Sequence, residues 1–569
     1  MNQTQAINTN GQDDVIQPKC TLPPPNELIL KWAETRSDEI YLKQIINRQF
    51  VEYSYADVAD KALRLVTALR EKGLQPGDKI ALVSKNCAEW FITDLALMLG
   101  DYVSVPIFPT AGAETIEYCA VHSESKALIV GKLDSSDAVA EVIKEMPQLL
   151  TISLPYDSAA ECQYQFNQLI EQSVPSESRP QHYDDKVMSI VYTSGTSGVP
   201  KGALLTYGAF SWSSQKLIEH IGIEPGDRLF SYLPLAHITE RVYIFGSSIA
   251  GGIQTAFPES LDTFIEDVKM HRPTLFISVP RLWALFQQRI QDKLPQKKLN
   301  FLLKIPFVNG LIKKKIAEGL GLDQGRVLGC GSAPVSPALL EWYHSVGLNI
   351  TEAWGMTESF AYSTLNYPFR ADKIGSVGNP GPGIEIKIAD DDEILVKSEG
   401  LFAGYYKNEK ATKESFNEEG WLHTGDIGDI DSEGYLTIQG RKKDTFKTAK
   451  GKFVAPVPIE KKLYEYSRVE MMCLIGLGMP APILLAVPHA FPNFDKERYE
   501  RRAARVIKRM NQDLESHEKI KGVLMIKEPW SIENGILTPT LKIKRHVLEK
   551  KYHEIGANWP SDKVVIWEE

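Results

Sequence analysis

The sequence predicts an α/β fold with two domains of unequal size. Up to about residue 360, apolar segments of strand length alternate with segments of helical periodicity, which indicates mixed or parallel sheets flanked by helices. From about Gly375 the pattern changes to short strands separated by turn residues, which predicts a small strand-rich subdomain. A chain of 569 residues is also too long for one hydrophobic core. We therefore expect a large N-terminal domain followed by a small α+β C-terminal domain.

The first elements can be assigned from their own local signals. Residues 1–25 are polar and proline-rich and lack the apolar stretch of a secretory signal, so we expect a flexible tail. The run Ser54-Tyr-Ala-Asp57 is typical of a capping box. Apolar residues at helical spacing follow it until Gly73, which can end a helix. A helix is therefore predicted between these two points.

Strand and helix patterns then alternate. Strands are predicted over 79–84, 102–107 and 127–130, with helices over 88–99 and from Ala113 onward. Because consecutive strands are separated by helices, they are expected to run parallel in one sheet.

The last third of the chain contains shorter elements. Strands are predicted over 384–388, 393–397 and 435–440. The most apolar stretch, 471–491, is interrupted by glycines and prolines, so it predicts two buried strands around a turn rather than a membrane-spanning helix. A basic loop begins at residue 441, and there we place the domain boundary. The predicted division is a tail at 1–25, a large domain at 26–440 and a small domain at 441–569.

Composition narrows the function classes. The formal net charge of −9 argues against general nucleic-acid binding, which needs a basic surface. The six cysteines lie far apart without a C-x-x-C pair, which favours reduced thiols and a cytoplasmic location over a disulfide scaffold or a zinc site. We expect no transmembrane segment, while contact with the inner face of a membrane stays open.

One stretch, residues 192–202, has the composition of a phosphate-binding loop. It holds three glycines, four Ser and Thr hydroxyls and Lys201, between an apolar run on each side. Glycines let backbone N–H groups approach an anion, and hydroxyls and a lysine add donors. The spacing differs from the G-x-x-x-x-G-K-[ST] loop, because Pro200 precedes the lysine and Gly202 follows it. A surface hairpin loop is the ordinary alternative.

Four further groups of residues stand out by their density of polar and small side chains. They are Leu233–Arg241, the pair Gly329–Pro334 and Thr351–Ser359, the pair Gly420–Asp426 and Gly440–Asp444, and Asn534–Arg545. Each has an ordinary explanation when taken alone. His237 could be a core or surface histidine, Thr357-Glu358 the start of a helix, Asp426 part of a tight turn, and Lys542 a solvated charge.

Taken together and in this order, the groups resemble the acyl-adenylate-forming (AMP-binding) superfamily, and within it the long-chain fatty acyl-CoA synthetases. The resemblance covers about residues 26 to 555. The superfamily is carried by the loop 192–202 together with Trp354-Gly-Met-Thr-Glu358, Thr424-Gly-Asp426, Gly440-Arg-Lys-Lys-Asp444 and Lys542. The long-chain type is carried by Leu233-Pro-Leu-Ala-His237 with Glu240-Arg241, by Lys442–Lys447, and by Asn534–Arg545.

The resemblance implies that a carboxylate attacks the α-phosphate of ATP, and that the thiol of coenzyme A then attacks the acyl-adenylate. The implied ATP- and AMP-binding residues are Thr193, Ser194, Gly195, Thr196, Ser197, Gly198, Lys201, Gly331, Ser332, Ala333, Pro334, Ala353, Trp354, Gly355, Met356, Thr357, Asp426 and Arg441. Thr193 and Glu358 would hold Mg²⁺, and Thr357 would contact the α-phosphate. Trp354 stands where the family more often has a tyrosine against adenine; its larger ring should serve as well.

Catalysis is implied for Lys542, Thr357, Glu358 and His237. Lys542 would reach in from the small domain and bridge the carboxylate and the α-phosphate, while His237 would orient the carboxylate. The small domain would then rotate about Lys443 and present a loop with Lys447, Gly451 and Phe453 to coenzyme A.

The acyl-binding part is less defined by the sequence. The segment Trp212–Trp283 is rich in large apolar residues that could line an alkyl tunnel or form plain core; they are Phe230, Tyr232, Tyr243, Phe245, Phe264 and Phe276. Two alternative activities remain open, namely transfer of the acyl group to a carrier protein and activation of an aryl or shorter acid. An inactive nucleotide-binding scaffold is disfavoured, because Lys542, Glu358 and Lys201 are all present.

Overall fold

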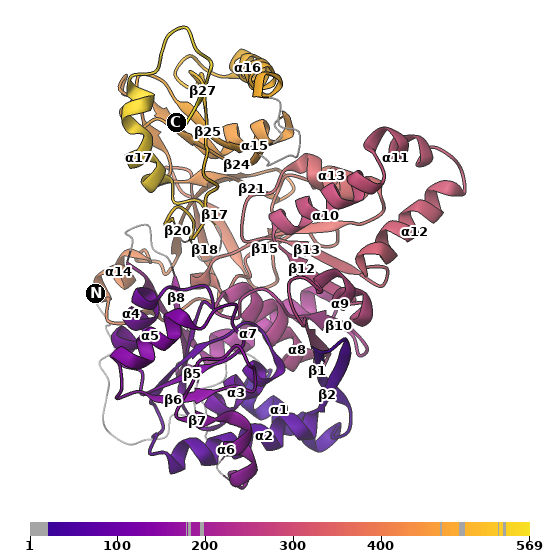
Figure 1. Cartoon of the computed structure of the whole chain (residues 1–569), viewed down its shortest axis with the longest axis vertical. Helices are drawn as coiled ribbons and strands as arrows, with labels where there is room; N and C mark the ends of the chain where they lie inside the picture. The colour runs from indigo at the N-terminus through magenta and orange to yellow at the C-terminus, as the bar shows by residue number, and fades with distance from the viewer. Residues whose placement is uncertain are drawn as a thin grey trace.

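The computed structural model describes residues 21–177, 179, 184–193, 199–466, 469–488, 496–532, 534–538 and 542–568. Two large sheets lie in the N-terminal part, a four-stranded sheet follows, and the C-terminal part stands at one end of the molecule (Figure 1). The predicted α/β fold is confirmed.

The first large sheet has eight strands in the order β19-β9-β8-β4-β3-β5-β6-β7. Strands β3 to β8 run parallel, whereas β8, β9 and β19 are antiparallel neighbours. Their bounds are β3 Lys79–Val83, β4 Val103–Ile107, β5 Ala127–Val130, β6 Leu150–Ser153, β7 Tyr164–Gln165, β8 Val187–Thr193, β9 Lys201–Thr206 and β19 Gly404–Tyr405.

The second large sheet has nine strands in the order β16-β15-β14-β13-β12-β10-β11-β1-β2. It is parallel from β1 to β14 and antiparallel at both edges. The bounds are β1 Ile40–Ile46, β2 Gln49–Ser54, β10 Arg228–Phe230, β11 Gln254–Phe257, β12 Leu275–Ser278, β13 Val327–Cys330, β14 Ile350–Trp354, β15 Thr364–Leu365 and β16 Asn379–Pro380.

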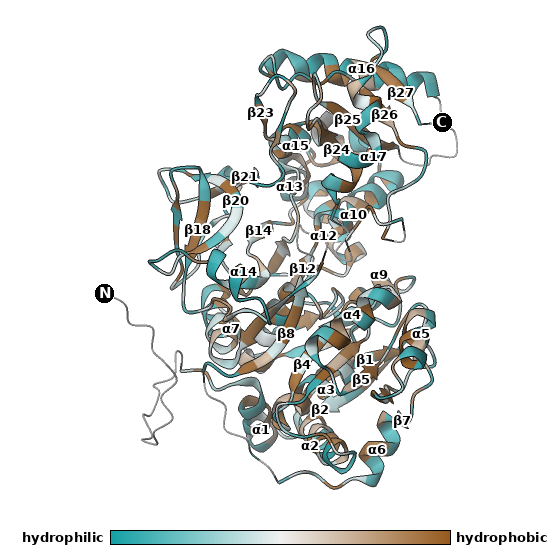
Figure 2. Ribbon diagram, turned by 90° about the vertical axis from the view of Figure 1, so that its left-hand side faces the viewer, coloured by the Kyte–Doolittle hydropathy of each residue, from teal (hydrophilic) through white to brown (hydrophobic). Residues whose placement is uncertain are grey.

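A layer of helices fills the space between the two sheets. Side chains from both sheets and from α1, α2, α3, α7 and α8 form one continuous core, and every residue of α3 is buried. The outer faces are covered by α4 and α5 on the eight-stranded sheet and by α9 to α13 on the nine-stranded sheet. Figure 2 shows β5 in brown and the outlying α16 largely in teal. The helix bounds in this part are α1 Pro25–Thr35, α2 Tyr55–Glu71, α3 Ala88–Leu99, α4 Ala113–Ser123, α5 Asp137–Glu145, α6 Phe166–Gln172, α7 Tyr207–Ile221, α8 Ser247–Gly251, α9 Phe264–His271, α10 Pro280–Lys293, α11 Gln296–Leu302, α12 Val308–Leu320 and α13 Pro337–Ser345.

The strand-rich part forms a separate antiparallel sheet in the order β17-β18-β20-β21, as the change of pattern near Gly375 predicts. Its bounds are β17 Glu385–Ile388, β18 Glu393–Lys397, β20 Leu422–Ile430 and β21 Leu436–Arg441, and α14 Glu409–Glu414 precedes β20.

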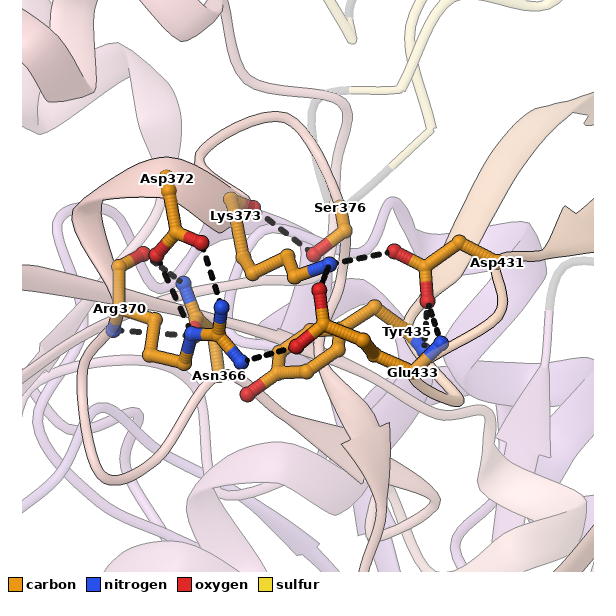
Figure 3. A network of polar contacts seen from close by, with 8 residues as sticks. All are labelled: Asn366, Arg370, Asp372, Lys373, Ser376, Asp431, Glu433 and Tyr435. Atoms are coloured by element: carbon orange, nitrogen blue, oxygen red, sulfur yellow. Dashed lines mark hydrogen bonds and ion pairs between the residues drawn. The ribbon is translucent and has the colours of Figure 1, made fainter.

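A cluster of ion pairs fixes this small sheet against the nine-stranded sheet (Figure 3). Arg370 and Lys373 come from the connection between β15 and β16, and Asp431 and Glu433 come from the turn between β20 and β21. Arg370 contacts Glu433 at 2.6 Å, and Lys373 contacts Asp431 at 2.8 Å. The Lys373 ammonium also lies 4.8 Å from the centre of the Tyr435 ring. The cluster therefore joins the two sheets at the ends of their strands.

The C-terminal part contains a two-stranded ribbon and a four-stranded sheet in the order β24-β25-β26-β27. The predicted pair of buried strands around a turn is confirmed as the antiparallel pair β24 and β25. The bounds are β22 Phe446–Lys447, β23 Phe453–Val454, α15 Pro456–Tyr466, β24 Val469–Ile475, β25 Ile483–Pro488, α16 Lys496–Asp513, β26 Val523–Met525, α17 Arg545–Ala557 and β27 Val565–Trp567. None of the helices in the described part of the chain is both long and apolar enough to cross a lipid bilayer.

Local signals explain the accuracy of several element boundaries. The Ser54 hydroxyl accepts a hydrogen bond from the N–H of Asp57, and the Asp57 carboxylate accepts from the N–H of Ser54, which is the predicted capping box of α2. The strand 127–130 and the helix 88–99 also have the predicted bounds.

A buried ion pair crosses the central helix layer. Arg241, in the π-helical turn Glu240–Gly246, donates from Nη2 to Oδ2 of Asp94 on α3 at 2.9 Å, and both side chains are inaccessible to solvent. The guanidinium also lies over the Trp90 ring, 5.4 Å from its centre. Because two charges are expensive to bury, each depends on the other for its compensation.

We expect Asp94→Ala to lower the free energy of unfolding by about 3–5 kcal/mol, because Arg241 would be left as an uncompensated buried charge. Chemical denaturation measures this loss. The matched control is Asp134→Ala, which removes an exposed partner of Lys85 and should cost less than about 1 kcal/mol. The double variant Asp94→Leu with Arg241→Met should recover most of the loss. Equal stability losses in Asp94→Ala and Asp134→Ala would contradict the assigned role of the pair.

Candidate active site

The ends of the predicted phosphate loop lie side by side at the end of the hairpin formed by β8 and β9. Thr193 pairs with Lys201 in the strand register, and the Thr193 hydroxyl donates to the Lys201 carbonyl at 3.5 Å. Ser194 to Gly198 lie outside the described residues. The stretch connects two antiparallel strands, and whether it binds phosphate stays a prediction.

Glu358 lies close to the lysine end of this loop. It follows β14 in the short helical turn Thr357–Ser359 and is 7% exposed. Its Oε1 accepts a hydrogen bond from the hydroxyl of Tyr405 at 2.5 Å, and the Lys201 ammonium lies 4.9 Å from the centre of the Tyr405 ring. Tyr405 sits on β19, which pairs with β9. The structure thus joins Thr193, Lys201 and Glu358 through one tyrosine.

The Asp426 carboxylate connects three parts of the chain. Its Oδ2 accepts from Nε1 of Trp354 at 2.9 Å, and its Oδ1 contacts Nε of Arg441 at 3.0 Å. Trp354 ends β14 in the nine-stranded sheet, whereas Asp426 and Arg441 face each other across β20 and β21. The carboxylate is buried, so the two donors compensate its charge.

Lys542 reaches this group from the C-terminal part. Asp426 and Glu358 attract its ammonium and Arg441 repels it. Protein atoms around the ammonium remove part of its hydration, while the residue as a whole stays accessible to solvent. This burial, together with the charge of Arg441, lowers the pKa of Lys542 to about 8. The lysine is therefore still largely protonated at pH 7, close to two carboxylates.

His237 is also close enough to Lys542 for their charges to interact. Burial, and then the charge of Lys542, lower the pKa of His237 to about 3, so the imidazole is neutral at physiological pH. Its Nδ1 accepts from the backbone N–H of Thr239 at 3.2 Å, which places the ring proton on Nε2. The hydroxyl of Thr239 in turn contacts that of Ser332 at 3.2 Å. His237 can thus offer a hydrogen bond from Nε2.

A mostly apolar cavity opens next to these residues between β13, β14 and the helix layer. Four of the residues predicted for nucleotide binding line it: Gly331, Ser332, Ala353 and Gly355. The rest of its wall is largely apolar and includes Ile221, Tyr243, Ile277, Val327 and Leu365. A side chain at Gly355 would collide with the backbone of Ala361, because a Cβ there would lie 2.4 Å from its carbonyl carbon. The cavity is small, about 30 Å³, and it meets the residues described above at Thr239 and Ser332.

Three other predicted nucleotide residues flank the cavity without lining it. Ala333 and Pro334 are exposed on the loop after β13, and Met356 is half-buried just before Glu358. Thr357 is half-buried beside Met356.

Most of the aromatic residues for which a tunnel wall and plain core stayed open belong to the core. Of the six named residues, only Tyr243 lines the cavity described above. Phe230, Tyr232, Phe264 and Phe276 stack on one another in the core of the nine-stranded sheet, and Phe245 packs on Phe91 between the sheets. Sequence pattern alone does not separate these cases, because core and tunnel walls are both apolar.

The residues predicted for the hinge and for coenzyme A lie at the start of the C-terminal part. Lys443 lies in the turn after β21, next to Lys442, which contacts Glu393 at 3.2 Å. Lys447 and Phe453 face each other across the ribbon of β22 and β23, and Gly451 forms its turn. The backbone of this ribbon is held by the turn after β24, through Gly478 and Met479. Thus Lys542, and not this ribbon, is beside Asp426 in the structure.

Sequence reasoning missed Tyr405 and Thr239. Tyr405 lies on a two-residue strand outside every motif, so its contact with Glu358 had no signal in the sequence. Thr239 lies within the group around His237, where a hydroxyl two residues after a histidine could have been noticed.

Comparisons with known proteins show which family the chain resembles. Residues 29–406 match the AMP-binding enzyme family, and residues 443–556 match the AMP-binding enzyme C-terminal domain. The chain is 31% identical to the peroxisomal long chain acyl-CoA synthetase 7 of Arabidopsis thaliana, covering 90% of this chain and 83% of the relative. It is 27% identical to the long-chain-fatty-acid–CoA ligase FadD15 of Mycobacterium bovis, covering 90% of this chain and 93% of the relative. Among solved structures, ATP-bound MatB from Rhodopseudomonas palustris matches with a TM-score of 0.74 and 22% identity, over 94% of this chain and 100% of MatB.

Proposed function

The chain belongs to the AMP-binding enzyme family, and from this we propose that it activates a long-chain fatty acid with ATP and transfers the acyl group to coenzyme A. Relatives in several organisms are named long-chain acyl-CoA synthetases or ligases. The observation that carries the proposal is that Lys542 lies close enough to Asp426, Glu358 and His237 to interact with them electrostatically, while Thr239, which hydrogen-bonds to His237, lines an apolar cavity. An aliphatic carboxylate needs such a pairing of an apolar wall with a cation at its open end.

In the first half-reaction, a carboxylate oxygen of the acid attacks the α-phosphorus of ATP and pyrophosphate leaves. Both reactants are anions, so cations and donors that meet the developing charge supply most of the acceleration. Lys542 would bridge the carboxylate and an α-phosphate oxygen, and the Nε2–H of His237 would orient the carboxylate. Thr357 would contact the α-phosphate, and Lys201 with the loop from Thr193 to Gly198 would hold the leaving pyrophosphate.

The nucleotide would be held by groups that the structure already brings together. Asp426 would accept from the ribose hydroxyls beside Arg441, and the Trp354 ring, held through its Nε1–H, would lie against adenine. Gly331 to Pro334 and Ala353 to Met356 would form the backbone edge of that pocket.

The buried carboxylate of Glu358 and the hydroxyl of Thr193 are hard oxygen donors and fit Mg²⁺ bound jointly with phosphate oxygens. When bound, the ion neutralises charge on the phosphates of ATP.

In the second half-reaction, the thiol of coenzyme A attacks the acyl carbonyl and AMP leaves. Because Lys542 then still lies beside the reacting groups, we propose that residues 441–569 rotate relative to residues 26–440 about Lys443. This movement would bring the ribbon with Lys447, Gly451 and Phe453 toward the acyl-adenylate. All cysteines that the structure describes are free thiols, which favours a cytoplasmic location.

The substrate proposal is tested by pyrophosphate release across a panel of carboxylic acids, with and without coenzyme A. We expect release with long-chain fatty acids, and turnover that continues only when coenzyme A is present, because the adenylate otherwise stays bound. Release with aryl or short acids alone would overturn the long-chain assignment. Turnover that is unaffected by coenzyme A would favour a carrier-protein acceptor.

Replacing Lys542 should separate the two half-reactions. We expect Lys542→Ala to lower ATP–pyrophosphate exchange by about 10²–10³ or more, because a transition-state contact is lost. Thioester formation from a supplied acyl-adenylate should change little. The control is Lys550→Ala, which removes an exposed lysine from α17 of the same domain. Equal losses in the two half-reactions would contradict a rotating domain.

The pKa of Lys542 predicts how adenylation depends on pH. Since its pKa is lowered to about 8, the ammonium is present below pH 8 and is lost as the pH rises through that value. We expect kcat/KM for exchange, which reports the free enzyme, to fall above about pH 8. In Lys542→Arg the cation persists at higher pH, so the remaining activity should lose this alkaline limb. An unchanged limb in Lys542→Arg would assign it to another group.

A further inference from the structure

A strongly basic segment lies outside the site and has no part in the chemistry above. We call residues 293–315 the arm; it runs from the end of α10 through α11 into α12. The arm holds seven lysines and no acidic residue, in a chain whose formal net charge is −9. The seven are Lys293, Lys297, Lys298, Lys304, Lys313, Lys314 and Lys315. Among the described residues, only Glu318 forms an ion pair with any of them, at 3.8 Å from Lys314.

The same arm exposes large apolar side chains. Phe307 is 97% exposed, Phe301 65% and Leu311 53%. Contact of a large apolar side chain with water is unfavourable, and covering that side chain with a binding partner would remove this cost. Figure 1 shows α11, α12 and their connection projecting at the edge of the molecule, away from the C-terminal part.

The arm is attached firmly by its inner face. Leu299 is fully buried, and Ile316 packs in the core on the outer side of the nine-stranded sheet. Gln296 accepts a hydrogen bond at Oε1 from Nε1 of Trp342 on α13, at 2.8 Å. The exposed side chains are therefore displayed from a fixed base.

Phe307 is held in a strained backbone conformation. Its φ is +68°, a value that a bulky side chain rarely adopts, and it stands directly before the first turn of α12. Glycine, which has no Cβ, would adopt this conformation at lower cost. An exposed phenylalanine at such a position is therefore explained better by a contact made with its ring than by packing within the chain.

We propose that the arm docks the protein on an anionic lipid bilayer, with Phe301, Phe307 and Leu311 entering the interface and the lysines contacting acidic headgroups. Exposed lysines around apolar side chains match a surface that is anionic outside and apolar beneath. Each buried aromatic side chain strengthens binding by about tenfold or more, and each lysine near such a surface by about fivefold. The arm thus has enough groups for reversible binding, independently of which acid the enzyme activates.

The test is sedimentation of the full chain with vesicles of phosphatidylglycerol and phosphatidylcholine, without ATP, acid or coenzyme A. Wild type should bind these vesicles, should bind pure phosphatidylcholine at least about tenfold more weakly, and should release as salt increases. The variant Phe301→Ser with Phe307→Ser and Leu311→Ser should lose at least about tenfold in partition. The variant Lys297→Glu with Lys298→Glu should lose a similar factor on anionic vesicles.

Two controls match these variants. Val174→Ser removes a side chain that is 70% exposed but lies far from the arm along the chain, after α6. Arg505→Glu with Lys508→Glu makes the same change of charge on α16, a helix that also holds seven basic residues, together with three acidic ones, but has no exposed large apolar side chain. Both controls should bind vesicles as wild type does.

Vesicle binding that is absent in wild type, or that survives in both arm variants, would overturn the proposal. A loss of binding in the α16 variant as large as in the arm variants would also overturn it, since attraction would then be diffuse. Self-association of wild type without vesicles that disappears in the arm variants would overturn it too, by identifying a second copy of the chain as the occupant. Activity on a fully dissolved acid should stay at the wild-type level in the arm variants, which separates this test from that of the proposed reaction.

Discussion

The carboxylate of Asp426 is the contact on which the arrangement of the site depends. It accepts a hydrogen bond from Trp354 of the nine-stranded sheet, pairs with Arg441 at the end of the strand-rich sheet, and attracts Lys542 of the C-terminal part. A buried carboxylate without such partners would cost several kcal/mol, so Asp426 depends on Trp354 and Arg441 to compensate its charge. The ion pairs of Figure 3 stabilise the same region, because Lys373 holds the β20–β21 turn at the end of the strand that carries Asp426. A mobile small domain is compatible with this contact, since Trp354 and Asp426 lie within residues 26–440 and Arg441 precedes the proposed hinge at Lys443.

Much of the fold could be predicted because its signals are local. The capping box at Ser54, the helix 88–99 and the strand 127–130 are each determined by neighbouring residues, and the structure has them at the predicted positions. The stretch from Met471 was also readable, since glycines and prolines exclude a long helix whatever the surroundings are. The site was predictable in a different way, through the order of its motifs. That order identifies which residues converge, although it gives no distances.

What could not be predicted depends on contacts between distant segments. Tyr232 and Tyr243 have the same chemistry and lie in the same apolar stretch, yet one stacks on Phe276 in the core and the other lines the cavity. Only the placement of the turn 240–246 relative to β14 separates them. Tyr405 is a similar case, because its contact with Glu358 arises from the pairing of β19 with β9 across about two hundred residues. By contrast, the sequence alone shows that residues 293–315 contain lysines and no acids. The inference of a docking surface also needed the exposure of Phe307, which only the structure shows.

The two cationic regions of this acidic chain differ in a way that matches their partners. Beside Asp426, burial lowers the pKa of Lys542, so its charge is costly and is kept by the short-range field of nearby acids. Such a cation interacts strongly only with charges a few ångströms away, so its electrostatic energy changes greatly when a phosphate binds or leaves. The lysines of the arm lie at the surface, six of them exposed and Lys313 half-buried, and their field is screened beyond about 10 Å by salt. A cation of this kind is effective against an extended surface with many negative charges and is weak against a single small ligand. The burial of the Lys542 ammonium therefore suits the binding of a small polyanion beside Asp426. The exposure of lysines on the arm suits the binding of a membrane surface.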